Sequence, residues 1–302
     1  MAKTVGSGKF TYEVDQEWAR LPQGWEMTTA AVAGDSQDRI YAFDRGDHPV
    51  MVFDREGNYL YSWAEGLIKM AHAIYIDAQD NVWLVDSHGG QVMKFTPEGK
   101  PLMTIGARGY RSDTGVDPND FGSDTHSRVT HAGGPFNIPA GVAVAPSGEV
   151  FVADGYANCR VHRFSPQGDL IMSWGGPGKE PGQFNLPHAV WIDRHGRVLV
   201  ADRENDRVQV FTQDGESLSV WPTELIGPAV IYIDGDDIAY VPEHNAGLFS
   251  ILTLEGERLA RWGSEVNRSC HGVWVDSHGD IYVVQPGDFG RKRRVVKYRR
   301  RG

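Results

Sequence analysis

The sequence predicts an all-β protein folded as a six-bladed β-propeller, and three observations lead to this prediction. A pair of short apolar strands around a polar turn recurs six times along the 302 residues, at a spacing of roughly 42 residues. Apolar and polar residues alternate with a period of two, and β-branched and aromatic residues are frequent, as is typical of strands. The 36 glycines and 16 prolines fit many short strands joined by tight turns.

The same elements follow one another in each repeat. The strand–turn–strand unit is clearest at 192–202, and its equivalents lie at 34–44, 76–86, 144–154, 233–243 and 275–285. A third strand ends in a large apolar residue with glycine four positions later, as in Phe53/Gly57, Phe95/Gly99, Phe164/Gly168, Phe211/Gly215, Leu252/Gly256 and Tyr298/Gly302. A fourth strand often ends in tryptophan: Trp63, Trp174, Trp221 and Trp262. Four strands per repeat are the number in a propeller blade.

The last repeat stops at Gly302, directly after its third strand. Because an open sheet edge favours aggregation, we expect segment 10–20, with the strand-like run Phe10–Trp18, to close the ring in the last blade. The second repeat is about 26 residues longer than the others, and its excess, 107–137, is predicted to be a long inserted surface loop. His126 and His131 in this loop are expected to be solvated. Residues 1–302 are predicted to form a single domain.

Composition excludes several classes of protein. The formal charge of −10 argues against a nucleic-acid binder, and the basic runs 291–294 and 299–301 are interpreted as a solvated strand end. The two cysteines imply no disulfide framework. Neither an apolar leader nor a run of about 18 apolar residues is present, so we expect a cytoplasmic protein that does not contact membranes. The oligomeric state stays open.

One position of the repeat alternates between alanine and histidine. Five residues before the aspartate of each turn stand Ala30, His72, Ala140, His188, Ala229 and His271. Innermost strands line a propeller's channel, and alternate blades of six are about 120° apart, so the three histidines are expected to meet on the axis. Three imidazoles suit Zn²⁺ best, with Fe, Co or Cu as alternatives, and the open fourth position is typical of a catalytic metal. The competing interpretation is three unrelated channel histidines bonded to water.

A second position, at the exit of the second strand, carries further candidates. Arg45 and Arg203 occupy it on opposite blades, and Tyr156 lies in the same layer. Arginines are usually solvated or paired with a neighbouring carboxylate, but two facing guanidiniums above a metal favour a clamp for a substrate carboxylate. Tyr156 is a candidate general base, although such a residue is more often a packed aromatic.

At these residues the sequence resembles the peptidyl-α-hydroxyglycine α-amidating lyases, which are six-bladed propellers of the NHL-repeat type. The resemblance runs from about Val32 to Val284, and its specific stretches are FDRGDH (43–48), DGYAN (154–158), PGQFNLPH (181–188) and ADREN (201–205). It implies a carbon–nitrogen lyase that cleaves the N–Cα bond of an α-hydroxyglycine unit and releases an amide and glyoxylate. The implied site residues are zinc ligands His72, His188 and His271, catalytic Tyr156, and active-site arginines Arg45 and Arg203.

The sequence also departs from this family. The family carries a structural calcium held by an aspartate directly after the last zinc histidine, but Gly272 stands there, so a Ca²⁺ site is doubtful. The family's disulfide cysteines are missing, with Ala157 in one of their places, which fits a cytoplasmic protein. We therefore expect a small substrate that carries a carboxylate: a carbinolamide, an N-hydroxyalkyl amide or a ureidoglycolate-like compound.

Two other functions remain open from the sequence. The first is another metal-dependent hydrolase or hydratase that uses the same three-histidine site. The second is a non-catalytic NHL propeller that binds a protein partner through its top face.

Overall fold

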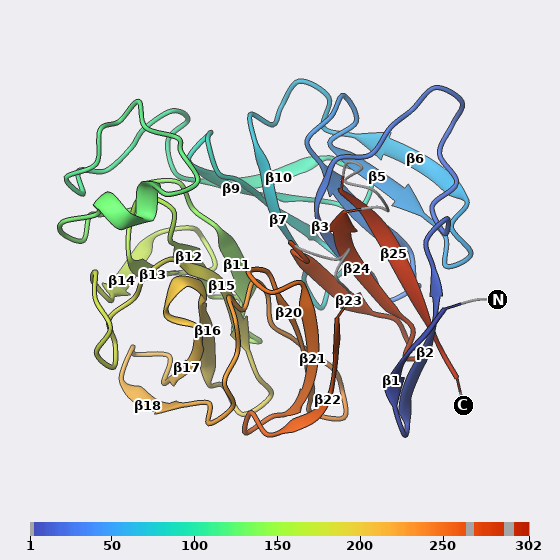
Figure 1. Ribbon diagram of the computed structural model, residues 1–302. Coiled ribbons are helices and arrows are strands. Elements are labelled where there is room, and N and C mark those ends of the chain that lie inside the picture. The colour runs from blue at the N-terminus through green and yellow to red at the C-terminus, as the bar shows by residue number, and fades with distance from the viewer. Residues whose placement is uncertain (1–2, 264–268, 287–292, 302) are drawn as a thin grey trace.

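The computed structural model describes residues 3–263, 269–286 and 293–301, and it has the predicted architecture (Figure 1). Six antiparallel sheets surround a central axis as the blades of a propeller. Five sheets have four strands each, and the sixth has five. No helix among the described residues is long and apolar enough to cross a membrane.

The blades follow the order of the chain. Blade 1 contains β3 (Thr29–Gly34), β4 (Ile40–Asp44), β5 (Val50–Phe53) and β6 (Tyr59–Trp63). Blade 2 contains β7 (Ala71–Ile76), β8 (Val82–Asp86), β9 (Gln91–Phe95) and β10 (Pro101–Ile105). Blade 3 contains β11 (Gly141–Val144), β12 (Val150–Asp154), β13 (Arg160–Phe164) and β14 (Leu170–Trp174).

The second half of the ring repeats this pattern. Blade 4 contains β15 (Pro187–Ile192), β16 (Val198–Asp202), β17 (Arg207–Phe211) and β18 (Ser217–Val220). Blade 5 contains β19 (Tyr232–Ile233), β20 (Ile238–Glu243), β21 (Leu248–Thr253) and β22 (Arg258–Gly263). Blade 6 contains β23 (Gly272–Val275), β24 (Ile281–Pro286), β25 (Arg293–Arg300), β2 (Phe10–Asp15) and β1 (Thr4–Ser7).

The N-terminal strand closes the ring in the last blade, as the sequence predicts (Figure 1). β2 pairs antiparallel with β25, with Tyr12 opposite Arg300 and Val14 opposite Tyr298. The closing strand covers residues 10–15 rather than 10–20. A fifth strand, β1, pairs with the outer edge of β2 and was not predicted.

Ion pairs join the closing segment to the C-terminal strand. Arg294 bonds Glu17 at 2.9 Å, Arg299 bonds Asp15 at 2.8 Å, and Arg301 bonds Glu13 at 2.5 Å. Arg299 and Arg301 are exposed, as expected of a solvated strand end, and the acidic N-terminal segment also faces this basic run. Each such surface pair is worth ~0–1 kcal/mol, so the pairs help the register more than the stability. Arg291 and Lys292, in the same run, lie outside the described residues.

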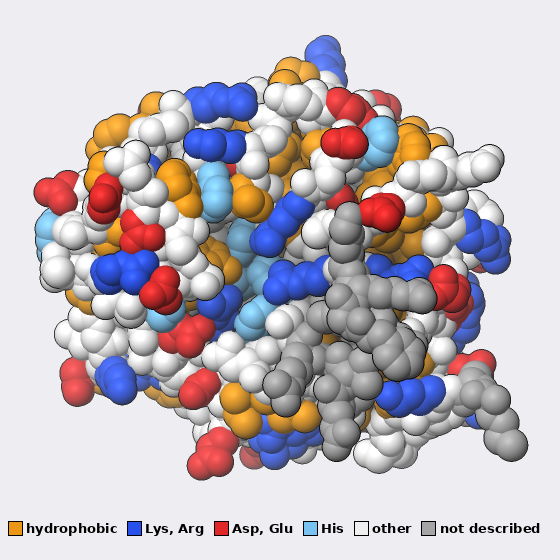
Figure 2. Space-filling view, turned by 45° about the horizontal axis from the view of Figure 1, so that its top comes forward, with side chains coloured by type: hydrophobic (Ala, Val, Ile, Leu, Met, Phe, Trp, Pro, Cys, Tyr) orange, Lys and Arg blue, Asp and Glu red, His pale blue; other side chains and the backbone are white. Residues whose placement is uncertain are grey.

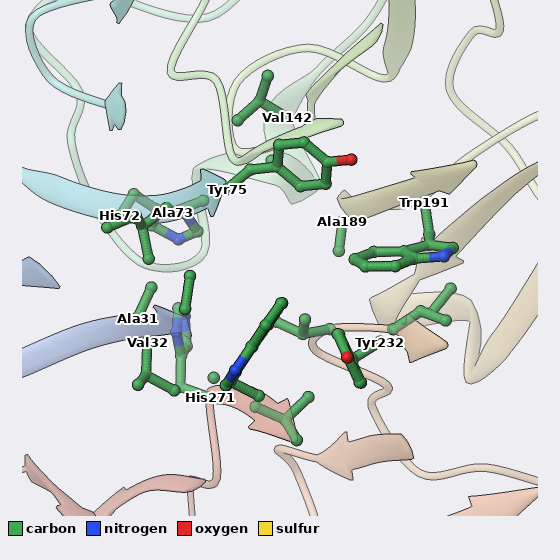
Figure 3. A pocket seen from close by; sticks show the side chains of 18 of the residues that line it. Ala31, Val32, His72, Ala73, Tyr75, Val142, Ala189, Trp191, Tyr232 and His271 are labelled. Carbon is green, nitrogen blue, oxygen red and sulfur yellow. The ribbon is translucent and has the colours of Figure 1, made fainter. Parts of the chain in front are cut away.

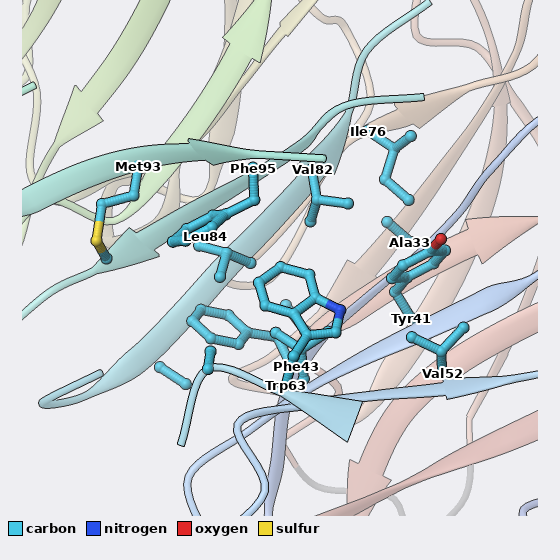
Figure 4. Close-up of a cluster of buried hydrophobic side chains, with 14 of the residues drawn as sticks. Ala33, Tyr41, Phe43, Val52, Trp63, Ile76, Val82, Leu84, Met93 and Phe95 are labelled. Atoms are coloured by element: carbon cyan, nitrogen blue, oxygen red, sulfur yellow. The ribbon is translucent and has the colours of Figure 1, made fainter. Parts of the chain in front are cut away.

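Neighbouring blades are joined by the tryptophans that end the outer strands. The Trp63 ring of blade 1 lies 5.1 Å from the Phe95 ring of blade 2, within a buried apolar cluster (Figure 4). Gly99, with φ +86°, turns beneath Trp63, where an added Cβ would lie 2.6 Å from the indole. Trp18 repeats this packing between blades 6 and 1, because its ring lies 5.4 Å from Phe53. The recurring aromatic–glycine spacing thus marks the place where a tryptophan of one blade packs on the next blade.

Candidate metal centre

The three histidines of the alternating position meet on the axis. His72, His188 and His271 are buried, and one ligand nitrogen from each lies within 4.8 Å of the others. Their ring centroids are 4.8 to 5.0 Å apart. Among the described residues, this is the one group of three or more potential ligands close enough to hold a metal ion.

Hydrogen bonds determine which nitrogen of each histidine ring is available to bind a metal ion. The Nδ1 atoms of His72, His188 and His271 lie 2.6, 2.6 and 2.7 Å from the carbonyl oxygens of three alanines: Ala140, Ala229 and Ala30, respectively. A carbonyl accepts only, so each Nδ1 carries the proton and donates it. Each Nε2 therefore keeps its lone pair for a metal, which is the usual arrangement of metal-ligating histidine. The donor set fits Zn²⁺.

Two local features place His72 and His188 at the axis. His72 is the extra residue of a bulge between Ala71 and Ala73, and His188 is the equivalent residue of β15. A bulge bends the strand and re-aims the side chain at this point. The preceding backbone is held by the acid that ends the second strand: Asp86 accepts from the Met70 N–H at 2.8 Å, and Asp202 accepts from the Asn185 N–H at 2.7 Å.

Burial keeps the three imidazoles neutral. It lowers the pKa of His72, His188 and His271 well below the ordinary histidine range, because the charged form loses its hydration. Positive charges reinforce the effect, from Arg45 on His72 and from Arg203 on His188. A metal ion would therefore meet little competition from protons at these nitrogens.

Tyr156 and the two predicted arginines lie on one side of the histidines. The Tyr156 hydroxyl is 3.1 Å from Nε2 of both His72 and His188, and it accepts from Arg203 Nη1 at 3.3 Å. Arg203 is buried and also bonds Glu204 at 2.8 Å. Arg45 donates from Nε to the Ala71 carbonyl at 3.0 Å, which holds it against the strand that carries His72.

These residues line a cavity of about 280 Å³ whose floor contains His72 and His271. Figure 2 shows this hollow, with histidine side chains between lysine and arginine side chains. The sequence reasoning did not identify four other side chains of its wall, namely His88, Phe121, His244 and Arg293. His244 follows Glu243 as Arg203 follows Asp202, so the repeat contained the signal for it. Arg293 begins a third strand, where the repeat offers no matching position.

The inserted loop 107–137 forms one side of the cavity. Phe121, Gly122 and Ser123 of this loop line it, and the Phe121 ring lies 4.6 Å from the His88 ring. The two loop histidines are elsewhere: His126 Nδ1 lies 3.0 Å from Asn185 Oδ1, and His131 is exposed. Part of this loop therefore shapes the candidate site.

A second, apolar cavity of about 60 Å³ lies on the other side of the histidines (Figure 3). Four aromatic residues line it: Tyr75, Trp191, Tyr232 and Trp274. Each ring contacts the next in this order, and the distances between neighbouring ring centroids are 5.9, 5.2 and 4.7 Å. Calcium requires oxygen ligands, and no carboxylate is among the described lining residues. A Cβ on Gly272 would lie only 3.1 Å from Ala31 Cα. These residues do not fit a calcium ion held by a side chain at position 272.

Comparisons with known proteins agree with this architecture. A family model of the NHL repeat matches residues 136–164 and 184–211. Peptidyl-alpha-hydroxyglycine alpha-amidating lyase 2 of Drosophila melanogaster is 34% identical over 305 residues, which cover 92% of this chain and 67% of that protein. Lyase 1 of the same organism is 32% identical over 299 residues, covering 88% and 52%.

A longer relative and a solved structure complete the comparison. Peptidyl-glycine alpha-amidating monooxygenase of Mus musculus is 32% identical over 244 residues, which cover 69% of this chain and 23% of that protein. The chain thus spans from about a quarter to two thirds of the length of these relatives. A streptogramin B lyase structure superposes with a TM-score of 0.62 at 9% identity, covering 95% of this chain and 97% of that one, and this likeness concerns the fold alone.

Proposed function

Because the chain belongs to the peptidyl-α-hydroxyglycine α-amidating lyases, we propose that it is a zinc-dependent lyase. In this proposal it cleaves the N–C bond of a small α-hydroxyglycine-like carbinolamide and releases an amide and glyoxylate. The observation that carries the proposal is the shared location of three unprotonated Nε2 atoms, the Tyr156 hydroxyl and the Arg203 guanidinium. A metal-binding set, a proton acceptor and a cation are the parts that this reaction needs.

The metal has a limited part in the proposal. His72, His188 and His271 would hold Zn²⁺, which would supply Lewis-acid polarisation of a substrate oxygen at its open position. The three histidines contribute their fixed tautomer and their burial, because both keep the Nε2 lone pairs free.

Tyr156 carries the proton transfers. As a phenolate it takes the proton of the α-hydroxyl group, and the freed electron pair forms the C=O bond of glyoxylate. The C–N bond then breaks, its electron pair goes to the nitrogen, and Tyr156 returns the proton to the leaving amide. Arg203 lies 3.3 Å from the phenol oxygen and stabilises negative charge there. Arg45 holds the carboxylate that becomes part of glyoxylate.

The test uses the zinc-containing protein and α-hydroxyhippurate, with glyoxylate and benzamide measured together. Wild type is expected to release both products in equal amounts. Tyr156→Phe is expected to lose at least ~10²-fold in rate, since it lacks the group that moves the proton, while zinc content stays unchanged. Tyr59→Phe is the matched control, because the Tyr59 hydroxyl donates to Ser62 on the outer strand of blade 1, away from the cavity.

Each contrary result points to a different conclusion. Full activity in Tyr156→Phe would remove this residue from the mechanism. A wild-type protein that holds zinc but releases no glyoxylate would favour another metal-dependent hydrolase or hydratase. A wild-type protein that holds no metal would favour a non-catalytic binding propeller.

A further inference from the structure

The cavity above the histidines carries more positive charge than the proposed reaction uses. Its described lining includes three arginines, Arg45, Arg203 and Arg293, and no carboxylate. Arg203 has a counter-charge directly beside it, the Glu204 carboxylate at 2.8 Å. Among the described residues, neither Arg45 nor Arg293 has a carboxylate within ion-pair distance. Within the described part of the chain, two guanidiniums of the cavity therefore have no acidic partner.

Arg293 differs in this respect from Arg294 and Arg299 of the same strand. Arg294 and Arg299 each bond an acid of the N-terminal segment. Arg293, at the start of β25, instead turns its half-buried side chain into the cavity. Burial, together with the positive charge of Arg45, lowers the pKa of Arg293, because a second cation nearby disfavours the charged form. An anion bound between the two side chains would remove this repulsion.

The arginines that line the cavity indicate how many anionic groups it can bind. The proposed reaction needs one carboxylate, the one that becomes glyoxylate, and Arg45 is placed to hold it. Glu204 neutralises Arg203, which is also engaged with Tyr156. Arg293 then has no acidic partner among the residues that the structure describes, although an arginine fork binds a carboxylate well.

We propose that the substrate is a dianion: an N-acyl-α-hydroxyglycine whose short acyl chain ends in a second carboxylate, which Arg293 binds. This inference rests on the proposed function for the position of the first carboxylate. The cavity of about 280 Å³ lies near the lower end of the range for small-molecule sites. Phe121, Gly122 and Ser123 limit it on one side, so the acyl chain is short, as in a succinyl group.

The experiment measures binding rather than turnover. The probes are N-succinylglycine and N-butanoylglycine, which lack the reacting hydroxyl and differ in the terminal carboxylate. Calorimetry with the zinc-containing wild type is expected to give at least ~10-fold tighter binding of N-succinylglycine, the size of one charge-assisted hydrogen-bonded contact. In Arg293→Met the ratio of the two dissociation constants is expected to fall to about 1. In Arg293→Lys, which keeps the charge without the fork, an intermediate ratio is expected.

Arg294→Met is the matched control, because it removes a neighbouring arginine of the same strand that faces Glu17 instead of the cavity. It should keep the wild-type ratio. Equal binding of the two probes by wild type would overturn the inference, and so would an unchanged ratio in a folded Arg293→Met protein. If the protein releases glyoxylate from α-hydroxyhippurate but does not prefer N-succinylglycine, the lyase proposal stands and the inference of a second carboxylate fails. If it prefers N-succinylglycine but releases no glyoxylate, Arg293 binds a second carboxylate and the proposed lyase reaction fails.

Discussion

The alternation of histidine and alanine around the axis has a physical reason in hydrogen bonding. Each histidine donates its Nδ1 proton to the carbonyl of the alanine in the next blade, for example His72 to Ala140. The alanines therefore leave room for the imidazoles and also fix their tautomer, by an acceptor that belongs to the backbone. The sequence predicted the alternation and the meeting on the axis. The hydrogen bonds were not predictable, because every residue has a backbone carbonyl and the sequence does not show which carbonyl accepts.

The candidate side chains of the cavity were predictable to the extent that they follow the repeat. Arg45, Arg203 and Tyr156 follow the acid that ends the second strand, so aligning the repeats identified them. Arg293 could not be found in this way, since it begins a third strand within a basic run that resembles a solvated end. Phe121 lies in the inserted loop, where no repeat register exists.

Buried neutral histidines predict a pH dependence of stability for the metal-free protein. Burial, with the charge of Arg203 next, lowers the pKa of His244 to about 4, and the three axial histidines are lowered as well. Below about pH 6.5 the unfolded chain binds protons that the folded chain refuses, so the free energy of unfolding falls as pH decreases. Each such histidine contributes up to ~1.4 kcal/mol per pH unit.

Urea unfolding of the metal-free protein between pH 7.5 and 5.5 measures this effect. His244→Gln is expected to make the fall below pH 6.5 shallower by about one histidine's contribution. His131→Gln, which alters an exposed loop histidine, should leave the fall unchanged. An equally steep fall in wild type and His244→Gln would show that His244 is not held neutral.

The packing between elements explains why the chain closes as it does. The first and last segments of the chain share blade 6, and β2 covers the edge of β25 that would otherwise be open. Trp18 then contacts Phe53 of blade 1, as Trp63 contacts Phe95 of blade 2. The closing strand was predictable because a blade with three strands is incomplete. The fifth strand β1 was not, since nothing in a four-strand repeat calls for it.

Removing a buried ring from the closing strand should weaken the whole propeller. Tyr12 of β2 is fully buried, and its ring lies 5.6 Å from Trp262 of blade 5. Tyr12→Ala is expected to lower the free energy of unfolding by about 3 kcal/mol, the cost of an unfilled core cavity. Chemical denaturation measures it, with Thr4→Ala on the exposed outer strand as a control that changes stability by less than ~0.5 kcal/mol. A loss below ~1 kcal/mol in Tyr12→Ala would mean that β2 does not hold the ring together.

At the scale of the whole molecule, six repeated blades form one site that contains three equivalent histidines. Alternate blades supply the histidines and the blades between them supply the carbonyl acceptors, so a complete ligand set requires the closed ring. The fold class and the number of blades followed from the repeat alone. The two cavities could not be predicted, because they depend on how the side chains of all six inner strands meet at the axis: polar and cationic on one side, apolar and aromatic on the other.

The metal content of the purified protein shows whether His72, His188 and His271 together hold one metal ion. Protein purified without chelators is expected to contain about one metal ion per chain by elemental analysis, with zinc as the main element. His188→Ala should lose most of it, whereas His126→Ala, in the inserted loop, should keep it. Less than about 0.2 metal ions per chain in wild type, or an unchanged content in His188→Ala, would mean that the three histidines do not hold a metal ion.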